Sequence, residues 1–592
     1  MPDNRYRDGD PRRGRPARPR RDSSASRPPR RRGSTPSGGG EPELLGRRAF
    51  VKGVLAAGFG ACVFKLAQHD IFYHGINMER LSDRREFNTP IHARRGTFYD
   101  RNGNVLATSE DCYNIALNPQ AIADVDKVVD ALVEYLGVER AEARDAAKQD
   151  STWVYVKRQV DTDTANELMA TELTGIEYES ATRRVYPYGN VASQVLGVVG
   201  TDNVGITGLE LQYEEDLHGT DGWIVREHAA DGSYIAGGAY SKQDAQDGSD
   251  LVLTLDVNIQ QAAEAALAEA VEDSGAHYGS ILVTEPATGE ILAACSYPSY
   301  SQTDLASART EDMNLRVVTD AYEPGSVFKA LVCGAAIDMG VVDTETTFTV
   351  PPVVMAGDDG VTDVDERDYT MDMTVREIMR RSSNTGMILI GEQMGADEFA
   401  RYLDAYGIDS SSGVDYPGEN AGIVKTRDEY DGASVAAMSF GQSLSVAPIR
   451  IARAMTAISN GGVMTTPHFL RSRQGEELDW SDKETRVISA DAAAAVADMM
   501  LTVVDEGTGS GGQVEGYEVS GKTGTAQRAD ESGGYQEDSY MSSFMGFAPT
   551  SDPAVQVYVT LDGTAYNSSV AAPPFAAVME ASLQALGIRP DR

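Results

Sequence analysis

The chain has 592 residues, too many for one hydrophobic core, and 41% of them are hydrophobic and 24% charged. This composition excludes whole-chain disorder and a polytopic membrane protein, and the length predicts two or more folded domains. The net charge of −38 is uneven, because residues 1–52 carry 14 Arg and one Lys against six acidic residues. The remaining body is strongly acidic and would repel phosphate backbones, which argues against nucleic-acid binding.

The four Cys and seven His show no spacing typical of metal ligands or of a disulfide framework. We therefore expect no metal and no other cofactor. The spacing leaves open whether Cys295 and Cys333 pair.

Residues 1–45 are rich in Arg, Pro, Ser and Gly, so we expect a disordered basic tail. The next segment, 46–70, contains an apolar run at 53–64, which is shorter than the roughly 20 residues of a spanning helix. If Lys52 and Lys65 extend toward the two membrane surfaces, the segment is long enough for a single membrane anchor. The upstream positive charge then predicts a cytoplasmic N-terminus and an extracytoplasmic body at the cell membrane.

Three readings of this segment remain open. Arg47 and Arg48 resemble a twin-arginine export signal, and the apolar run has the length of a cleaved signal-peptide core. A retained anchor and a cleaved signal both put residues after 70 outside the cytoplasm. A buried helix would not.

Residues 71–247 mix short strands, turns and helices, so we expect a mixed α/β domain. Asn102-Gly103 lies between two apolar runs, as in a β-hairpin, and a helix is predicted near 125–135. The glycines of 197–208 lack the strand–GxGxxG–helix context of a dinucleotide site.

A polar linker at 243–250 precedes a second domain, 248–592, of α+β type. A strand is predicted at 251–256, followed by a helix that Asp256 or Asn258 would cap. Further strands are predicted at 279–286, 290–298, 518–526, 542–549 and 554–562, and a final helix at 574–586. Strands at both ends with helices between them imply one sheet that joins the two ends of the domain.

The segment 323–340 predicts a Pro-Gly turn and then a helix from Ser326 to Gly340. Ser326 and Lys329 are three residues apart and would lie on one helical face. A neutral amine there can take the proton of the hydroxyl, and the helix N-terminus favours a developing alkoxide. Taken alone the pair is a common coincidence, and a solvated lysine is the alternative.

Two further motifs carry candidate functional groups. In RRSSNTGM, Ser382 could relay a proton and Asn384 could hold both a lysine and a substrate carbonyl, although a helix cap is the alternative. In SGKTGTA, Lys522 and Thr523 could bind a carboxylate while the strand pairs with an extended peptide. Gly524 marks a close approach within that strand, and the surrounding residues do not fit a phosphate loop.

The order S-x-x-K, S-x-N, K-T-G is typical of penicillin-binding proteins and serine β-lactamases. The chain resembles the class B penicillin-binding proteins, which are monofunctional peptidoglycan D,D-transpeptidases. The similarity extends over RRGTFYDRNGNVLA (94–107), RRVYPYGN (183–190), the Gly-Gln segment 439–462 and the C-terminal 571–588. The septal, cell-division branch is the closer one.

The resemblance implies a transpeptidase domain over 248–592, with an antiparallel sheet flanked by helices. Residues 71–247 would be a non-catalytic pedestal of the penicillin-binding protein dimerisation type. The expected substrates are stem peptides ending in D-Ala-D-Ala, and β-lactams are the expected covalent inhibitors. A lipid II polymerase and divisome membrane proteins are the expected partners.

The resemblance also implies residue roles. Ser326 attacks the D-Ala-D-Ala carbonyl, releases D-alanine and is the residue that β-lactams acylate. Lys329 accepts the serine proton, Ser382 relays protons to the leaving group, and Asn384 positions Lys329 and the substrate amide.

The third motif completes the expected site. Lys522 belongs to the catalytic set, and with Thr523 it lies where the substrate carboxylate binds. Gly524 and Thr525 complete the substrate-binding strand. The backbone N–H groups of Ser326 and Thr525 form the oxyanion hole.

Two alternatives of other kinds remain. A β-lactamase or D,D-carboxypeptidase would use water as the acyl acceptor, and a receptor or divisome scaffold would turn over nothing. Between residues 385 and 521 no Glu is followed by x-x-Leu-Asn, the motif that carries the hydrolytic base of class A β-lactamases. The long first domain and the complete set of motifs favour the transpeptidase.

Overall fold

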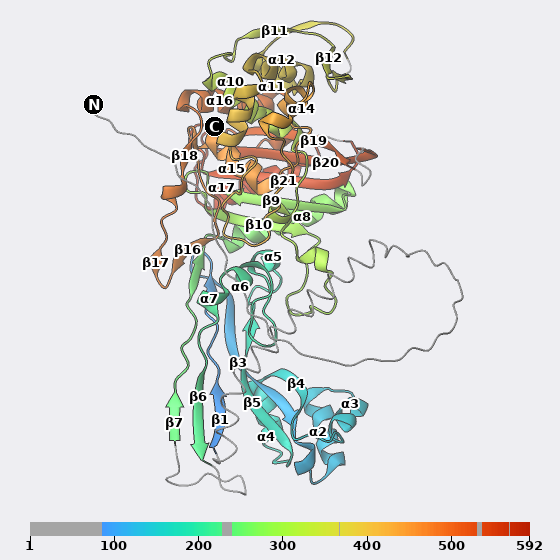
Figure 1. Cartoon of the computed structure of the whole chain (residues 1–592), viewed down its shortest axis with the longest axis vertical. Helices are drawn as coiled ribbons and strands as arrows, with labels where there is room; N and C mark the ends of the chain where they lie inside the picture. Colours follow the sequence, from blue (N-terminus) through green and yellow to red (C-terminus); the bar gives the residue numbers. More distant parts are fainter. Residues whose placement is uncertain (1–85, 228–239, 366, 530–534, 567–568) are drawn as a thin grey trace, which may run out of the picture. The chain divides into compact units, whose positions relative to one another are not determined.

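The computed structural model describes residues 86–592 except 228–239, 366, 530–534 and 567–568 (Figure 1). The predicted basic tail, 1–45, and the predicted anchor, 46–70, lie outside the described residues. In the part of the chain that is described, no helix is both long enough and apolar enough to cross a membrane.

The first part of the described chain contains strands and short helices. Its elements are β1 (Glu86–Ile91), β2 (Phe98–Tyr99), β3 (Val105–Leu117), η1 (Pro119–Ala121), α2 (Val125–Leu136), α3 (Arg140–Ala146), β4 (Val154–Asp161), α4 (Thr162–Met169), β5 (Ile176–Val185), α5 (Ser193–Leu196), α6 (Gly208–Gln212), α7 (Glu214–Leu217), β6 (Gly222–Glu227) and β7 (Tyr240–Gln243). Strand β3 pairs antiparallel with β4 and β5, and β1, β6 and β7 form a separate antiparallel sheet.

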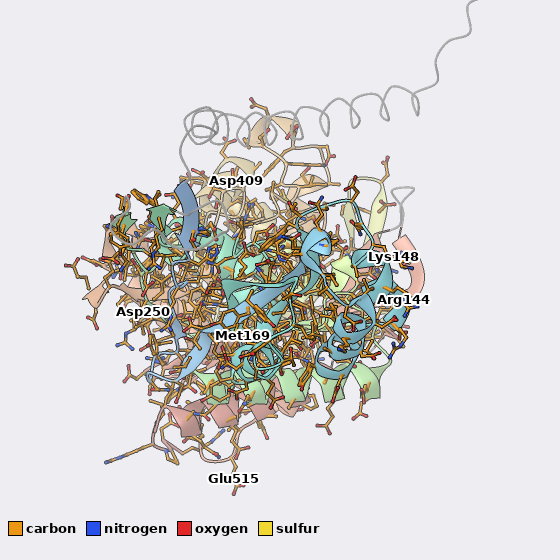
Figure 2. The ribbon with its side chains drawn as sticks, turned by 90° about the horizontal axis from the view of Figure 1, so that it is seen from below. Arg144, Lys148, Met169, Asp250, Asp409 and Glu515 are labelled. Atoms are coloured by element: carbon orange, nitrogen blue, oxygen red, sulfur yellow. The ribbon has the colours of Figure 1, made fainter. Side chains whose placement is uncertain are left out.

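The hairpin and the helix expected in this part are both present. Strand β2 pairs with β3 across a turn in which Gly103 has a φ of 86°. Helix α2 begins where the side chain of Asp124 accepts a hydrogen bond from the N–H of Lys127, and it ends at Gly137 in the left-handed region. The apolar face of α2 packs with α4 on β3. The exposed Lys148 follows α3 and lies at the periphery (Figure 2).

The second part holds the remaining elements. They are β8 (Leu251–Leu253), α8 (Val257–Ser274), β9 (Tyr278–Thr284), β10 (Ile291–Tyr297), η2 (Thr310–Met313), α9 (Arg316–Thr319), η3 (Gly325–Phe328), α10 (Lys329–Asp338), β11 (Thr347–Val350), β12 (Val353–Ala356), β13 (Asp359–Thr362), β14 (Met371–Thr374), α11 (Val375–Arg381), α12 (Asn384–Met394), α13 (Ala396–Ala405), η4 (Arg427–Glu429), α14 (Ser434–Ser439), α15 (Pro448–Ser459), β15 (Val463–Met464), β16 (Leu470–Arg473), β17 (Glu476–Glu477), η5 (Ser481–Lys483), β18 (Thr485–Arg486), α16 (Ala490–Glu506), η6 (Ser510–Gly512), β19 (Ser520–Ala529), β20 (Tyr535–Ala548), β21 (Val555–Thr564) and α17 (Ala572–Ala585).

Strands from both ends of this part form one antiparallel sheet, as predicted. Its order is β10-β9-β21-β20-β19, and Val283 of β9 lies opposite Val557 of β21 (Figure 1). Both faces of the sheet are covered, which explains why β9 and β21 are nearly continuous apolar runs. Ile281 and Val283 pack with α8 and α17, whereas the intervening Leu282 joins the core of α10, α15 and α16 on the other face.

Strand β8 joins the two parts of the described chain through hydrogen bonds. It pairs in parallel with β2, where Phe98 lies opposite Leu251, and antiparallel with β16, where Leu253 lies opposite Leu470. The strand predicted at 251–256 therefore ends at residue 253. The side chain of Asp256 then accepts from the N–H groups that open α8, so Asp256 rather than Asn258 caps this helix.

The cysteines within the described residues are unpaired. Cys112, Cys295 and Cys333 are all free and buried. Cys295 lies on β10 and Cys333 on α10, so the pairing left open by the sequence does not occur in this structure.

Candidate active site

The predicted nucleophile lies in a tight turn between two other backbone segments. The helix expected from Ser326 begins as the single 3₁₀ turn η3, and regular α-helix starts at Lys329. Gly325 has a φ of 58°, and its N–H donates to the carbonyl of Gly441 at 3.0 Å. A Cβ on Gly325 would lie 2.8 Å from the carbonyl oxygen of Thr525. The turn is therefore held between residue 441 and β19, and it leaves Ser326 partly exposed.

Lys329 lies one turn further along and is fully buried. Its Nζ donates to the carbonyl oxygen of Ser382 at 2.6 Å, to Oδ1 of Asn384 at 2.7 Å and to Oγ of Ser382 at 3.2 Å. Burial lowers the pKa of Lys329 to about 7, and the negative charge of Asp363 opposes this shift. A large fraction of this amine is therefore neutral near neutral pH.

The S-x-N turn presents two side chains to this amine because of its backbone. Ser382 ends α11 with a φ of 57°, and Ser383 caps the start of α12 by accepting from the N–H of Gly386. The helix cap that the sequence left open is thus provided by the middle residue of the motif. Ser382 and Asn384 on either side of it both contact Lys329.

Lys522 on β19 also donates to the hydroxyl of Ser382. This fully buried lysine donates to Oγ of Ser382 at 2.9 Å and to the carbonyl oxygen of Thr523 at 3.1 Å. Burial, reinforced by the nearby Lys329, lowers the pKa of Lys522 well below its usual range. Neither lysine has an ion-pair partner within the described residues, so a ligand carboxylate could pair directly with Lys522.

Gly524 is required by packing against protein atoms. A Cβ there would lie 2.3 Å from Oγ of Ser543, 2.7 Å from Cγ2 of Val327 and 3.2 Å from the carbonyl oxygen of Pro324. The close approach predicted at this glycine is thus made by β20 and the nucleophile turn. Its assignment as a substrate-binding residue stays a prediction.

Within the described residues, strand β19 has no strand partner on the edge beside the nucleophile. It is the last strand in the order of the five-stranded sheet. Oγ1 of Thr523 lies 3.3 Å from Oγ1 of Thr508, and the buried Oγ1 of Thr525 has no hydrogen-bond partner among the described residues. A pocket of about 420 Å³ continues from this strand, lined among others by Tyr322, Glu323 and Ala526. The edge and the pocket together can take an extended peptide.

Two residues in contact with the S-x-N turn were missed by sequence reasoning. Asp363 accepts hydrogen bonds from Ser383 and Thr385, and it pairs with Arg367. The only signal in the sequence was an opposite-charge pair four residues apart within an acidic loop, which also occurs on solvated surfaces. Within the described ranges, no group of three or more His, Cys, Asp or Glu side chains could hold a metal ion.

Comparison with known families gives two matches. The penicillin binding protein transpeptidase domain matches residues 279–580, and the penicillin-binding protein dimerisation domain matches residues 90–253. The probable peptidoglycan D,D-transpeptidase PenA of Neisseria meningitidis is 32% identical over 92% of this chain and 94% of that protein. The peptidoglycan D,D-transpeptidase FtsI of Escherichia coli is 28% identical over 85% of each.

Solved structures show the same fold. A putative peptidoglycan glycosyltransferase from Atopobium parvulum has a TM-score of 0.68 at 37% identity and covers 85% of this chain and 100% of that chain. Its name indicates another activity, whereas the families matched here are a transpeptidase and a dimerisation domain. Penicillin binding protein 3 of Mycobacterium tuberculosis, complexed with aztreonam, has a TM-score of 0.67 at 26% identity and covers 85% and 98%.

The family assignment follows from the extent of these matches. The transpeptidase family covers more than half of the chain, and the relative from Neisseria meningitidis spans most of it. The three motifs meet around Lys329 and Ser382 within that matched region. The chain belongs to the class B penicillin-binding proteins.

Proposed function

We propose that this chain is a serine D,D-transpeptidase that cross-links peptidoglycan stem peptides ending in D-Ala-D-Ala. One observation carries the proposal: a buried amine with a pKa of about 7 lies one helical turn from a partly exposed serine. Relatives named peptidoglycan D,D-transpeptidases support it.

In the proposed first step, the neutral amine of Lys329 takes the proton of Ser326, and Oγ attacks the carbonyl carbon of the penultimate D-alanine. A C–O bond forms and the C–N bond to the last D-alanine breaks. The leaving nitrogen receives a proton through Oγ of Ser382, which both lysines contact. The backbone N–H groups of Ser326 and Thr525 stabilise the oxyanion. An amine of a second stem peptide then displaces the serine.

Lys522 would recognise the terminal carboxylate of the donor peptide. Its three contacts are all oxygen atoms without formal charge, on Ser382 and Thr523. A bound carboxylate favours the protonated lysine, so binding of the donor should draw a proton into the site. The acceptor or donor peptide would pair with the free edge of β19.

β-Lactams should acylate the same serine, in keeping with the aztreonam complex of the M. tuberculosis protein. The test uses the full-length chain, a fluorescent penicillin and mass spectrometry to map the adduct. Ser326→Ala should lose all covalent labelling and keep its melting temperature, whereas the exposed Ser307→Ala should label normally. Normal labelling of Ser326→Ala would refute the mechanism.

We also propose that residues 46–70 anchor the protein in the cell membrane and that the body acts outside the cytoplasm in cell division. The basic flank of residues 1–52, the apolar run and the similarity to FtsI support this. A lipid II polymerase and divisome membrane proteins are the proposed partners. Protease added to spheroplasts should remove the body and spare a small N-terminal fragment. Mature protein that begins shortly after Ala67 would establish a cleaved signal instead.

A further inference from the structure

Asp363 and Arg367 form a buried ion pair behind the S-x-N turn. Nη2 of Arg367 lies 3.1 Å from Oδ2 of Asp363, and only 3% and 7% of the two side chains are exposed. We propose that this pair is a positioning unit for the reaction: it fixes the turn that carries Ser382 and Asn384, and so holds Lys329 in its working place. The inference rests on the proposed function and adds two residues to its machinery.

The carboxylate of Asp363 binds both neighbours of Asn384. Oδ2 accepts from Oγ of Ser383 at 2.8 Å and from Oγ1 of Thr385 at 3.0 Å, and Oδ1 accepts from the N–H of Thr385 at 3.0 Å. These contacts place a negative charge at the N-terminus of α12, where the helix dipole stabilises it. The residues before and after Asn384 therefore cannot move without breaking a buried hydrogen bond.

The residue before Asp363 sets the orientation of the Asn384 amide. Nδ2 of Asn384 donates to the carbonyl oxygen of Thr362 at 3.2 Å. An amide has two donors on its nitrogen and only acceptors on its oxygen, so this bond turns Oδ1 toward Lys329. Oδ1 meets Nζ of Lys329 at 2.7 Å. The segment 362–363 thus determines which end of the amide faces the catalytic amine.

Arg367 ties the segment to the rest of the fold. Nη1 donates to the carbonyl oxygens of Val350 and Tyr369, each at 2.8 Å, and Nη2 donates to that of Pro351 at 2.9 Å. Nη2 of Arg367 also donates to Oγ1 of Thr385 at 3.0 Å. The planar guanidinium makes these contacts at once, which a lysine ammonium could not. Its positive charge also offsets the cost of burying the Asp363 carboxylate.

The carboxylate of Asp363 also acts on Lys329 electrostatically. Among the described residues, the titratable groups that face Lys329 are Asp363, Lys522 and Cys333. Burial raises the pKa of the Cys333 thiol to about 12, so it is neutral at physiological pH. Although burial raises the pKa of Asp363, hydrogen bonds from Thr385 and Ser383 hold it below the usual range. Asp363 is thus the negative charge that favours the protonated form of Lys329.

The test measures acylation of the full-length protein in detergent by a fluorescent penicillin, in stopped flow from pH 5 to 9. Asp363→Asn should lower the second-order rate constant roughly 10- to 100-fold, because misplacement of a catalytic group by about 1 Å costs this much. It should also move the acid midpoint of the profile to lower pH, because the charge that favours the protonated lysine is gone.

Matched variants separate this role from a general loss of structure. Asp359→Asn removes an equal charge from an exposed position on the adjacent β13 and should change neither the rate nor the midpoint. If Asp363→Asn does not fold, Thr385→Val removes the hydroxyl that donates to Asp363 and accepts from Arg367, and it keeps the ion pair. It should slow acylation several-fold with an unchanged midpoint.

Three outcomes would overturn the proposal: a wild-type rate in Asp363→Asn, a midpoint in that variant that does not move, or a wild-type rate in Thr385→Val. Failure of the wild-type protein to acylate at Ser326 would instead refute the proposed function.

Discussion

The buried amine of Lys329 should give acylation a steep dependence on pH. Its pKa is about 7 instead of the ordinary 10.5. At pH 7.5 about three quarters of such a lysine is neutral, compared with roughly 0.1% of a solvated one, so burial raises the concentration of the base several-hundred-fold. At pH 5 only about 1% remains neutral, and the acylation rate should fall roughly 75-fold below its value at pH 7.5.

The assay follows acylation of Ser326 by a fluorescent penicillin from pH 5 to 9. The acylation rate should rise with pH, with a midpoint near pH 7. Lys329→Met should abolish labelling at every pH. Lys127→Met, at a side chain that is 73% exposed, is the matched control and should leave the profile unchanged. A rate independent of pH, or a midpoint near 10, would refute the assignment of Lys329 as the base.

The same lysine should affect stability with a definite sign. Its pKa is lower in the folded than in the unfolded state, so the unfolded chain binds more protons between about pH 7 and 10.5, and this group makes the free energy of unfolding rise with pH in that window. Below pH 7 the buried lysine is protonated, and this lowers the free energy of unfolding by its full amount, on the order of 5 kcal/mol. Thermal unfolding should therefore show that Lys329→Met gains more stability, relative to wild type, at pH 6 than at pH 9.

Three further predictions concern packing, burial and hydrolysis. Gly524→Ala should lower the free energy of unfolding, measured by thermal unfolding, by roughly 1–3 kcal/mol and should slow acylation, because its Cβ would lie 2.3 Å from Oγ of Ser543. An unchanged acylation rate would contradict the packing argument. Arg95→Met removes one of the two buried arginines that pair with Glu210, leaving only Arg184, and should lower the free energy of unfolding in urea by roughly 1–3 kcal/mol, whereas the exposed Arg94→Met should lower it by less than about 1 kcal/mol. The penicillin adduct should persist for many minutes, because loss of a general base slows deacylation roughly 10²–10⁴-fold; timed mass spectrometry that finds penicilloate released within seconds would favour a β-lactamase.

Much of the active site was predictable because its residues lie in short motifs with a chemical reason for their spacing. The three motifs identified both lysines that donate to Oγ of Ser382, although the motifs lie far apart in the chain. The two-ended sheet was predictable as well, because strands buried on both faces stand out as apolar runs such as 279–286.

Other features depend on contacts that no local pattern specifies. Asp363 lies in the same acidic segment as the exposed Asp359 and Asp365, and only the fold turns it inward. The early end of β8 at residue 253 is set by its partners β2 and β16, which lie far away in sequence. The close approach at Gly524 is made by β20 and the nucleophile turn, which lie far from it in sequence.

The pairing of β9 with β21 has a consequence for biosynthesis. Val283 pairs with Val557, which lies about 270 residues later in the chain. At a synthesis rate of about 5–20 residues per second, the ribosome needs roughly 14–55 s to make the intervening segment. During that time β9 and β10 can form a hairpin, but the apolar edge of β9 has no partner. Its sequence, YGSILVT, contains no charge and no proline, which is typical of strands that associate between chains. Nascent or truncated chains that end before residue 555 would therefore aggregate through this edge.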